Sequence, residues 1–306
     1  MRWRSLAALL PLFLLLATAP ASSAPAFDGQ AAFRHVEKIV RFGPRPSGSE
    51  ALARTRRYIA DELRAAGFRV RQEPFTSTTP DGPIKMANMI GEIEGRRSDV
   101  IVVGGHYDTK HFPNFRFVGA NDGGSSSGFL LELARALARA KPEFTYWIVF
   151  FDGEEARREW SRDDSLYGSR HFVRSLAASG QLKRVRAAIV ADMIGDRDLA
   201  IRREAGSTPW LSDLIWQAAA KLGYQRHFPE SALAVEDDHS PFLEAGVPAA
   251  LLIDFDYGGR PGENAFWHTP EDTLDKVGAR SLAIVGEVLL EALRAVERAL
   301  VQEKPK

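Results

Sequence analysis

A set of acidic and imidazole side chains follows the ends of apolar segments, where such groups could hold a metal ion and move protons. They are His106, Asp108, Asp122, Glu154, Glu155, Asp192, Asp237, His239 and His268. Histidines and carboxylates that leave one position open for water or substrate make up catalytic zinc sites, whereas structural zinc sites are closed and often use cysteine. The chain contains no cysteine. The composition therefore favours a catalytic zinc centre.

The adjacent carboxylates of Glu154 and Glu155 suggest one metal ligand and one general base. They follow the apolar run 148–151 and a break at Asp152 and Gly153. Such a run is typical of a strand buried on both faces. In open α/β sheets, ligands bind outside the carboxyl ends of the strands. The runs 99–105 and 185–191 end in the same way, at His106 and Asp192, so we expect these side chains to meet at one edge of one sheet.

Each of these residues has an ordinary structural alternative. Glu154 and Glu155 could form a solvated acidic turn, and Asp122 could cap the helix that follows it. His106 could be a packed histidine at a sheet edge, and His268 could be a turn residue. The shared position of these residues at the predicted strand ends favours a metal site, because independent capping and turn residues need not gather at one edge of a sheet.

Strand and helix patterns alternate along the chain. We expect helices at 31–41, 50–66, 125–140, 165–179, 208–222, 241–244 and 279–301. We expect strands at 68–76, 84–93, 99–105, 144–151, 185–191 and 249–254, with 198–202 extending or neighbouring the fifth. This alternation predicts a three-layer α/β/α fold with helices on both faces of a central mixed, mostly parallel sheet, whose first two strands are antiparallel.

The composition sets limits on the partners. Of the 306 residues, 45% are hydrophobic, which suits one sizeable domain over residues 27–306. Forty basic residues balance forty acidic ones, so no overall field attracts nucleic acid or an anionic membrane. We expect a monomer that acts on a small molecule or peptide.

The first 26 residues have the pattern of a secretory signal peptide. Arg2 and Arg4 precede the apolar run 6–17, and alanines follow it. That run is shorter than the about 20 residues of a spanning helix. We expect cleavage before residue 27 and export to the periplasm or medium, without disulfides. An uncleaved membrane anchor is the alternative.

Five short motifs resemble the successive metal-site motifs of the M28 family of zinc peptidases. They are His106-Tyr107-Asp108, Gly119-Ala120-Asn121-Asp122, Phe151-Asp152-Gly153-Glu154-Glu155, Asp192-Met193-Ile194-Gly195 and Trp267-His268-Thr269. Within that family, segments 150–170 and 236–243 resemble the glutaminyl cyclase branch. The chain differs from the animal cyclases at Gly105, at Leu251 and in the loop 255–266, which leaves the pocket wall and the activity open.

The resemblance implies a role for each group of site residues. It implies that Asp122, Glu155 and His268 hold zinc and that Glu154 moves the proton. A hydrogen-bonded acidic network of Asp192 and Asp237 would lie beside the metal, and the indoles of Trp160 and Trp267 would shape the substrate pocket.

The resemblance also implies an activity and two alternatives to it. A glutaminyl-peptide cyclotransferase would convert the N-terminal glutamine of a peptide or protein to pyroglutamate and release ammonia. A secreted M28 aminopeptidase with one or two zinc ions would use Glu154 to activate water, and His106 and Asp192 could then hold the second metal. An inactive binding ectodomain is the third possibility, which the intact set of zinc ligands and base disfavours.

Overall fold

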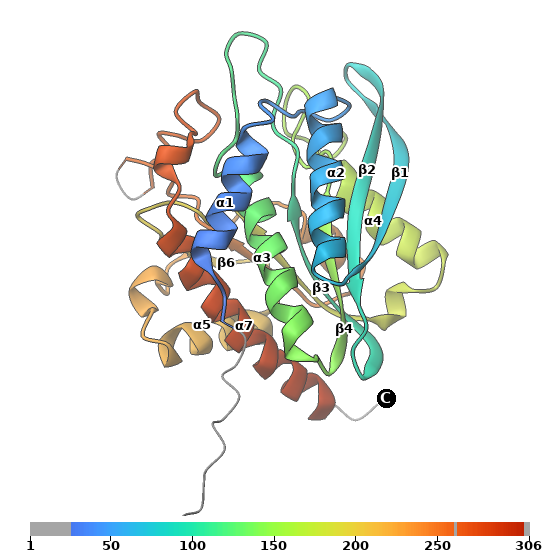
Figure 1. Cartoon of the computed structure of the whole chain (residues 1–306), viewed down its shortest axis with the longest axis vertical. Helices are drawn as coiled ribbons and strands as arrows, with labels where there is room; N and C mark the ends of the chain where they lie inside the picture. Colours follow the sequence, from blue (N-terminus) through green and yellow to red (C-terminus); the bar gives the residue numbers. More distant parts are fainter. Residues whose placement is uncertain (1–25, 260–261, 303–306) are drawn as a thin grey trace, which may run out of the picture.

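A six-stranded sheet forms the centre of the protein (Figure 1). The structure is a computed structural model, and it is described here for residues 26–259 and 262–302. The strand order is β1-β2-β4-β3-β5-β8. The strands are β1 (Arg69–Thr79), β2 (Gly82–Ile93), β3 (Arg97–His106), β4 (Phe144–Phe151), β5 (Val185–Asp192) and β8 (Ala249–Ile253).

The sheet is parallel in its middle and antiparallel at one side. The four strands β4, β3, β5 and β8 run parallel, while β1 and β2 form an antiparallel hairpin that joins β4 through β2. In register, His106 pairs with Phe151, and Asp192 pairs with Ile253. The predicted mixed sheet is therefore confirmed, and the carboxyl ends of its parallel strands meet at one edge.

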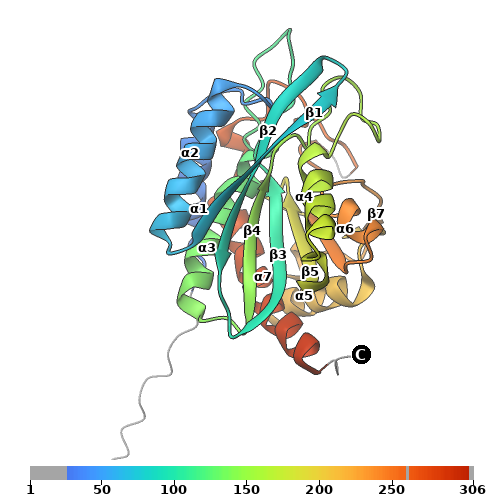
Figure 2. The ribbon, with the colours of Figure 1, turned by 90° about the vertical axis from the view of Figure 1, so that its right-hand side faces the viewer.

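Helices cover both faces of the sheet (Figure 2). One face carries α1 (Gly29–Val40), α2 (Glu50–Ala65), α3 (Gly124–Ala140), α5 (Pro209–Lys221) and α7 (Ala279–Gln302). The other face carries α4 (Tyr167–Ala178) and the short α6 (Ser240–Glu244). Because both faces are covered, every residue of β4 is buried. This explains why the sequence of β4 is one apolar run and does not alternate between apolar and polar residues.

One expected strand is absent from its predicted place. Residues 198–202 do not extend β5; the nearby β6 (Arg203–Glu204) instead pairs with β7 (Ala232–Leu233) in a separate two-stranded sheet. The main chain there is held by irregular contacts, since Ala200 N donates to Asp254 Oδ2 and Ile201 N donates to His227 O. In the part of the chain described, no helix is long and apolar enough to cross a membrane. The predicted signal peptide lies outside the described residues, except for Ala26.

Candidate metal centre and substrate pocket

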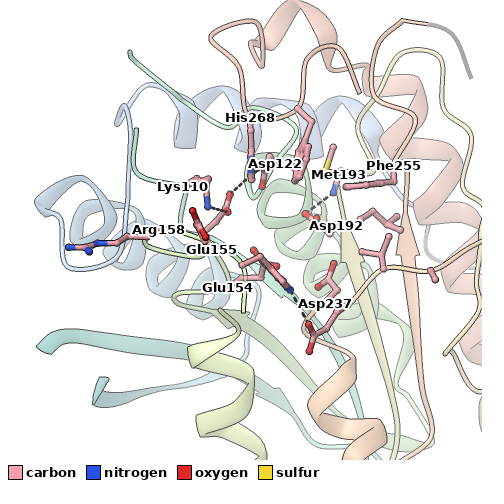
Figure 3. Close-up of a pocket in the computed structure, with 17 residues that line it drawn as sticks. Lys110, Asp122, Glu154, Glu155, Arg158, Asp192, Met193, Asp237, Phe255 and His268 are labelled. Carbon is pink, nitrogen blue, oxygen red and sulfur yellow. Dashed lines mark hydrogen bonds and ion pairs between the residues drawn. The ribbon is translucent and has the colours of Figure 1, made fainter. Parts of the chain in front are cut away.

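A pocket of about 470 Å³ opens at the edge of the sheet where the parallel strands end (Figure 3). His106 ends β3, Asp192 ends β5, and Glu154 and Glu155 follow β4 after a turn at Gly153. The pocket is lined by Lys110, Asp122, Glu154, Glu155, Arg158, Glu159, Trp160, Asp192, Met193, Ala234, Val235, Glu236, Asp237, Ile253, Phe255, Trp267 and His268. The strand-end carboxylates thus converge on one cavity, as their positions in the sequence predicted.

Asp122, Glu155 and His268 form one group of possible metal ligands. Their ligand atoms lie within 4.8 Å of one another. His268 Nε2 lies 3.1 Å from Glu155 Oε1 and 3.3 Å from Asp122 Oδ2, and Figure 3 shows both carboxylates directed toward this imidazole. These three residues come from segments far apart in the sequence, so only the folded chain makes them a group.

His106, Asp122 and Asp192 form a second such group. His106 Nε2 lies 3.0 Å from Asp192 Oδ1 and 3.2 Å from Asp122 Oδ1. Asp122 therefore belongs to both groups, with one carboxylate oxygen directed to each imidazole. A carboxylate shared between two ligand sets could bridge two metal ions, as in two-metal sites.

The conformation around Asp122 shows that this residue does not cap the helix beside it. The N-cap of α3 is Gly123, with φ 72°, and no side chain caps the helix. A Cβ atom at this glycine would lie 2.5 Å from Asp108 O and 3.0 Å from His106 Cε1. Gly123 thus lets the loop approach His106 closely, and the Asp122 carboxylate remains available for a ligand.

The two adjacent glutamates have different surroundings. Glu155 belongs to the first ligand group, whereas Glu154 Oε2 lies 3.9 Å from His106 Nδ1 and its main-chain N donates to Asp108 Oδ1. Burial raises the pKa of Glu154 well above its usual range, and the charges of Glu155 and Asp237 add to this effect. A carboxylate with a raised pKa is a stronger base than an ordinary one, which suits general acid/base work.

Two other groups of the site, His268 and Asp237, also have raised pKa values. Burial alone would lower the pKa of His268, but Glu155 and Asp122 raise it to about 10. Burial raises the pKa of Asp237 well above its usual range, and the charge of Asp192 contributes. A divalent cation could displace such protons, because metal ligands must be deprotonated.

The donor set fits zinc. Asp122 Oδ2 is buried and has no hydrogen-bond partner among the described residues, which leaves a lone pair free. Two carboxylates and one imidazole are ligands that Zn²⁺ accepts in catalytic sites, with a fourth position left for substrate. Zinc at Asp122, Glu155 and His268 would satisfy this oxygen and neutralise much of the local negative charge.

Aromatic side chains form the pocket walls. Trp160 Nε1 donates to Glu236 Oε2 at 3.0 Å, and Glu236 lies 3.5 Å from Arg170. Trp267 and Phe255 contact each other edge to face on another side of the pocket. The two predicted indoles thus both line the pocket.

Two predicted candidates lie outside both the ligand groups and the pocket lining. His239 pairs with Glu204, at 3.1 Å from Nε2 to Oε2, and does not line the pocket. Asp108 accepts a bond from Glu154 N and also lies outside both ligand groups. Sequence reasoning missed Lys110, whose Nζ lies 3.9 Å from Glu155 Oε2. Its position close after His106 was the only available signal.

The predicted hydrogen bond between Asp192 and Asp237 is not found among the described residues, and each carboxyl group accepts a bond from a main-chain N–H instead. Asp192 Oδ1 accepts from Met193 N and contacts His106, and Asp237 Oδ1 accepts from Asp238 N. The two groups therefore influence each other mainly through charge, and Asp192 contributes to the raised pKa of Asp237.

Several known proteins are similar to this chain in sequence and in fold. The sequence model of peptidase family M28 matches residues 88–293. The mouse (Mus musculus) glutaminyl-peptide cyclotransferase-like protein is 33% identical over 258 residues, which span 75% of this chain and 66% of that protein.

Two solved structures resemble the fold. A glutaminyl cyclase from an Acidobacteriales bacterium has 42% sequence identity and a TM-score of 0.86, covering 92% of this chain and 99% of its own. A leucine aminopeptidase precursor from Bacteroides thetaiotaomicron has 27% identity and a TM-score of 0.80, covering 88% and 98%. The chain belongs to peptidase family M28, in the group of the glutaminyl-peptide cyclotransferases.

Proposed function

We propose that this protein is a zinc-dependent glutaminyl-peptide cyclotransferase that acts on the N-terminal glutamine of peptides or proteins. Asp122, Glu155 and His268 are the proposed zinc ligands, and Glu154 is the proposed catalytic acid/base. One observation carries the proposal: the buried Glu154, with its raised pKa, lies beside the first ligand group in a pocket walled by aromatic residues. The 42% identity to a glutaminyl cyclase supports the choice of reaction.

In the proposed reaction the substrate folds back on itself. Bound zinc would polarise the carbonyl of the glutamine γ-amide. The α-amine of the same residue attacks the γ-carbonyl carbon, the bond to the amide nitrogen breaks, and ammonia leaves. Glu154 takes a proton from the attacking amine and passes it to the departing nitrogen.

The remaining residues of the pocket orient the substrate. Trp160, Trp267 and Phe255 line the cavity and would hold the two reacting ends of the glutamine together, which is a proximity effect. The buried carboxyl groups of Asp192 and Asp237 would offer hydrogen-bond acceptors to the amino end of the substrate and help to place it beside Glu154. No attacking water is required.

An aminopeptidase is the second candidate, and the second ligand group favours it. His106 and Asp192 share Asp122 with the first group, so the chain has the side chains for two metals. In that case Glu154 would activate a water molecule, and the 27% identity to a leucine aminopeptidase precursor is compatible with this chemistry.

A side-by-side assay separates the two candidates. Zinc-loaded protein is incubated with a glutaminyl peptide and with leucyl and arginyl amides, and ammonia, pyroglutamyl product and free amino acid are measured. We expect cyclisation with little amide hydrolysis and one zinc per chain. Two zinc ions per chain, with amide hydrolysis and unchanged glutaminyl peptide, would instead establish the aminopeptidase.

We also propose that the chain is exported. The order of arginines, apolar residues and alanines before residue 27 supports this. Peptides outside the cytoplasm would then be its substrates.

A further inference from the structure

Arg45 is completely buried, yet it pairs with no carboxylate side chain within hydrogen-bond distance among the described residues. Its guanidinium instead donates to four main-chain carbonyl groups. Nε donates to Tyr107 O at 2.9 Å, Nη1 donates to Val118 O, and Nη2 donates to Gly119 O at 2.9 Å and to Asp122 O at 3.4 Å. A buried cation is costly unless its donors are satisfied, and these bonds offset the cost of burying Arg45.

These carbonyl groups belong to two loops, one that follows His106 and one that carries Asp122. Tyr107 directly follows His106, and the segment 118–122 ends at Asp122. Arg45 is also joined to the first loop through its main chain, since its N–H donates to Thr109 Oγ1 at 3.0 Å. One side chain therefore fixes the separation between the two loops.

Asp272 holds the same segment from the other side. Its carboxylate accepts from Asn121 N at 2.8 Å and from Asp122 N at 3.1 Å. The main-chain N–H of Asp122 thus points to a buried carboxyl group, while its carbonyl group points to a buried cation. Asp272 also follows His268 by four residues, so it links the loop of the proposed histidine ligand to that of the shared aspartate.

We propose that Arg45 and Asp272 are positioning residues that hold the main chain of Asp122 from both sides and thereby set the affinity of the site for zinc. Metal–ligand distances tolerate only about 0.2 Å of error, so a loosened Asp122 loop would bind the ion less tightly. The charge of Arg45 also opposes the repulsion among nearby carboxylates: burial lowers its pKa to about 10, and Asp122 and Asp272 counteract this. Arg45 thus stays protonated at neutral pH.

The inference rests on the proposed zinc centre and is tested by zinc affinity. Arg45→Lys keeps the charge but cannot reach four carbonyl groups with the planar fork of arginine. Residues that support metal ligands from outside typically contribute about 10–100-fold to affinity. We expect the zinc dissociation constant of Arg45→Lys, measured by competition with a chelator, to rise by that factor.

Arg135→Lys is the matched control. Arg135 pairs with the buried Glu132 on α3, and neither residue lines the pocket. We expect its zinc affinity to stay within about twofold of the wild type. Zinc should also raise the Tm of Arg45→Lys less than that of the wild type at the same zinc concentration, because weaker binding stabilises less. A purely structural role would lower Tm equally with and without zinc.

Asp272→Asn provides a second variant if Arg45→Lys does not fold. An amide keeps one acceptor oxygen and places an NH₂ group against one of the two main-chain donors, so we expect a similar rise in the zinc dissociation constant. Wild-type zinc affinity in the folded Arg45→Lys protein, or in Asp272→Asn if the first variant does not fold, would overturn the inference and leave the proposed function intact. A wild-type protein that binds no zinc would overturn the proposed function itself.

Discussion

The indole of Trp267 stacks on the imidazole of His268, with ring centroids 4.0 Å apart and an angle of 20° between the planes. His268 has φ 54°, a left-handed backbone conformation that is uncommon for histidine. Phe117 contacts the same imidazole edge to face, at 5.8 Å and 90°. The aromatic neighbours therefore keep this strained residue in one orientation, with Nε2 directed to Asp122 and Glu155.

Trp267→Leu tests whether the indole of Trp267 orients His268 and the substrate. We expect zinc to remain bound, because all three proposed ligands are intact, while kcat/KM for a glutaminyl peptide falls by up to about 10²-fold through misplacement of the reacting groups. Zinc content and steady-state kinetics are measured on the same preparation. Trp210→Leu, on α5 and outside the pocket, is the control and should have wild-type kinetics. A zinc-free Trp267→Leu protein would contradict the prediction.

His268→Ala tests the ligand assignment. Removing one of three protein ligands should abolish stoichiometric zinc binding at micromolar zinc and with it the activity. Metal analysis after gel filtration measures the content, and chelation of the wild type followed by zinc addition should first remove and then restore activity. His227→Ala serves as control, at a half-buried histidine near the small sheet whose Nδ1 lies 2.9 Å from Leu199 O. Full zinc content in His268→Ala would show that another histidine binds the metal.

Glu154→Gln separates proton transfer from metal binding. The amide keeps the size of the side chain but cannot carry a proton, so kcat should fall by about 10²–10⁴-fold. Zinc content should remain at the wild-type level, because Glu154 lies outside both ligand groups. If the variant instead loses zinc and excess zinc restores its rate, Glu154 is a ligand and Glu155 is the proton carrier.

The pair of Glu204 and His239 predicts a pH-dependent contribution to stability. Burial alone would raise the pKa of Glu204, but bonds from His239, Gly206 and Ser207 lower it from 4.5 to about 2. A lowered folded-state pKa stabilises the protein above about pH 4.5, and this stability is lost as the pH falls toward 2.

Glu204→Gln should therefore reduce the free energy of unfolding most at neutral pH, and the difference from wild type should shrink as the pH falls below about 4.5. Urea unfolding at several pH values measures this. Glu230→Gln, which removes an exposed carboxylate paired with Arg203, should have a much smaller effect. If the free energies of unfolding of Glu204→Gln and wild type differ by the same amount at pH 7 and at pH 3, the lowered pKa of Glu204 is not the cause of the difference.

The start of the mature chain is the last prediction. We expect it between Ser22 and Phe27, because the small residues there follow the apolar run of a signal peptide. Ala26 O accepts a bond from Arg135, and Phe27 is buried, so the folded domain uses the chain from this point onward. Intact-mass measurement of protein recovered from the periplasm or medium provides the test, and a full-length exported product would disagree with it.

Much of the fold follows from local patterns. The continuous apolar runs of β3, β4 and β5 indicated strands covered on both faces, because only side chains removed from water on both sides need no alternation. The polar residues after those runs, among them His106 and Asp192, then had to lie at one edge, since parallel strands end on the same side. The irregular stretch 198–202 was mistaken for a strand because short apolar runs do not distinguish strands from loops held by tertiary bonds.

The sequence by itself thus determined the layers, the edge that carries the chemistry and the residue types available there. Only the tertiary structure decided that Asp122 lies between His106 and His268 and that His239 pairs with Glu204 instead. It also revealed Arg45 and Asp272 on either side of the Asp122 main chain. These contacts join segments far apart in the chain, and whether two such segments meet depends on how the whole core packs, which no local pattern records.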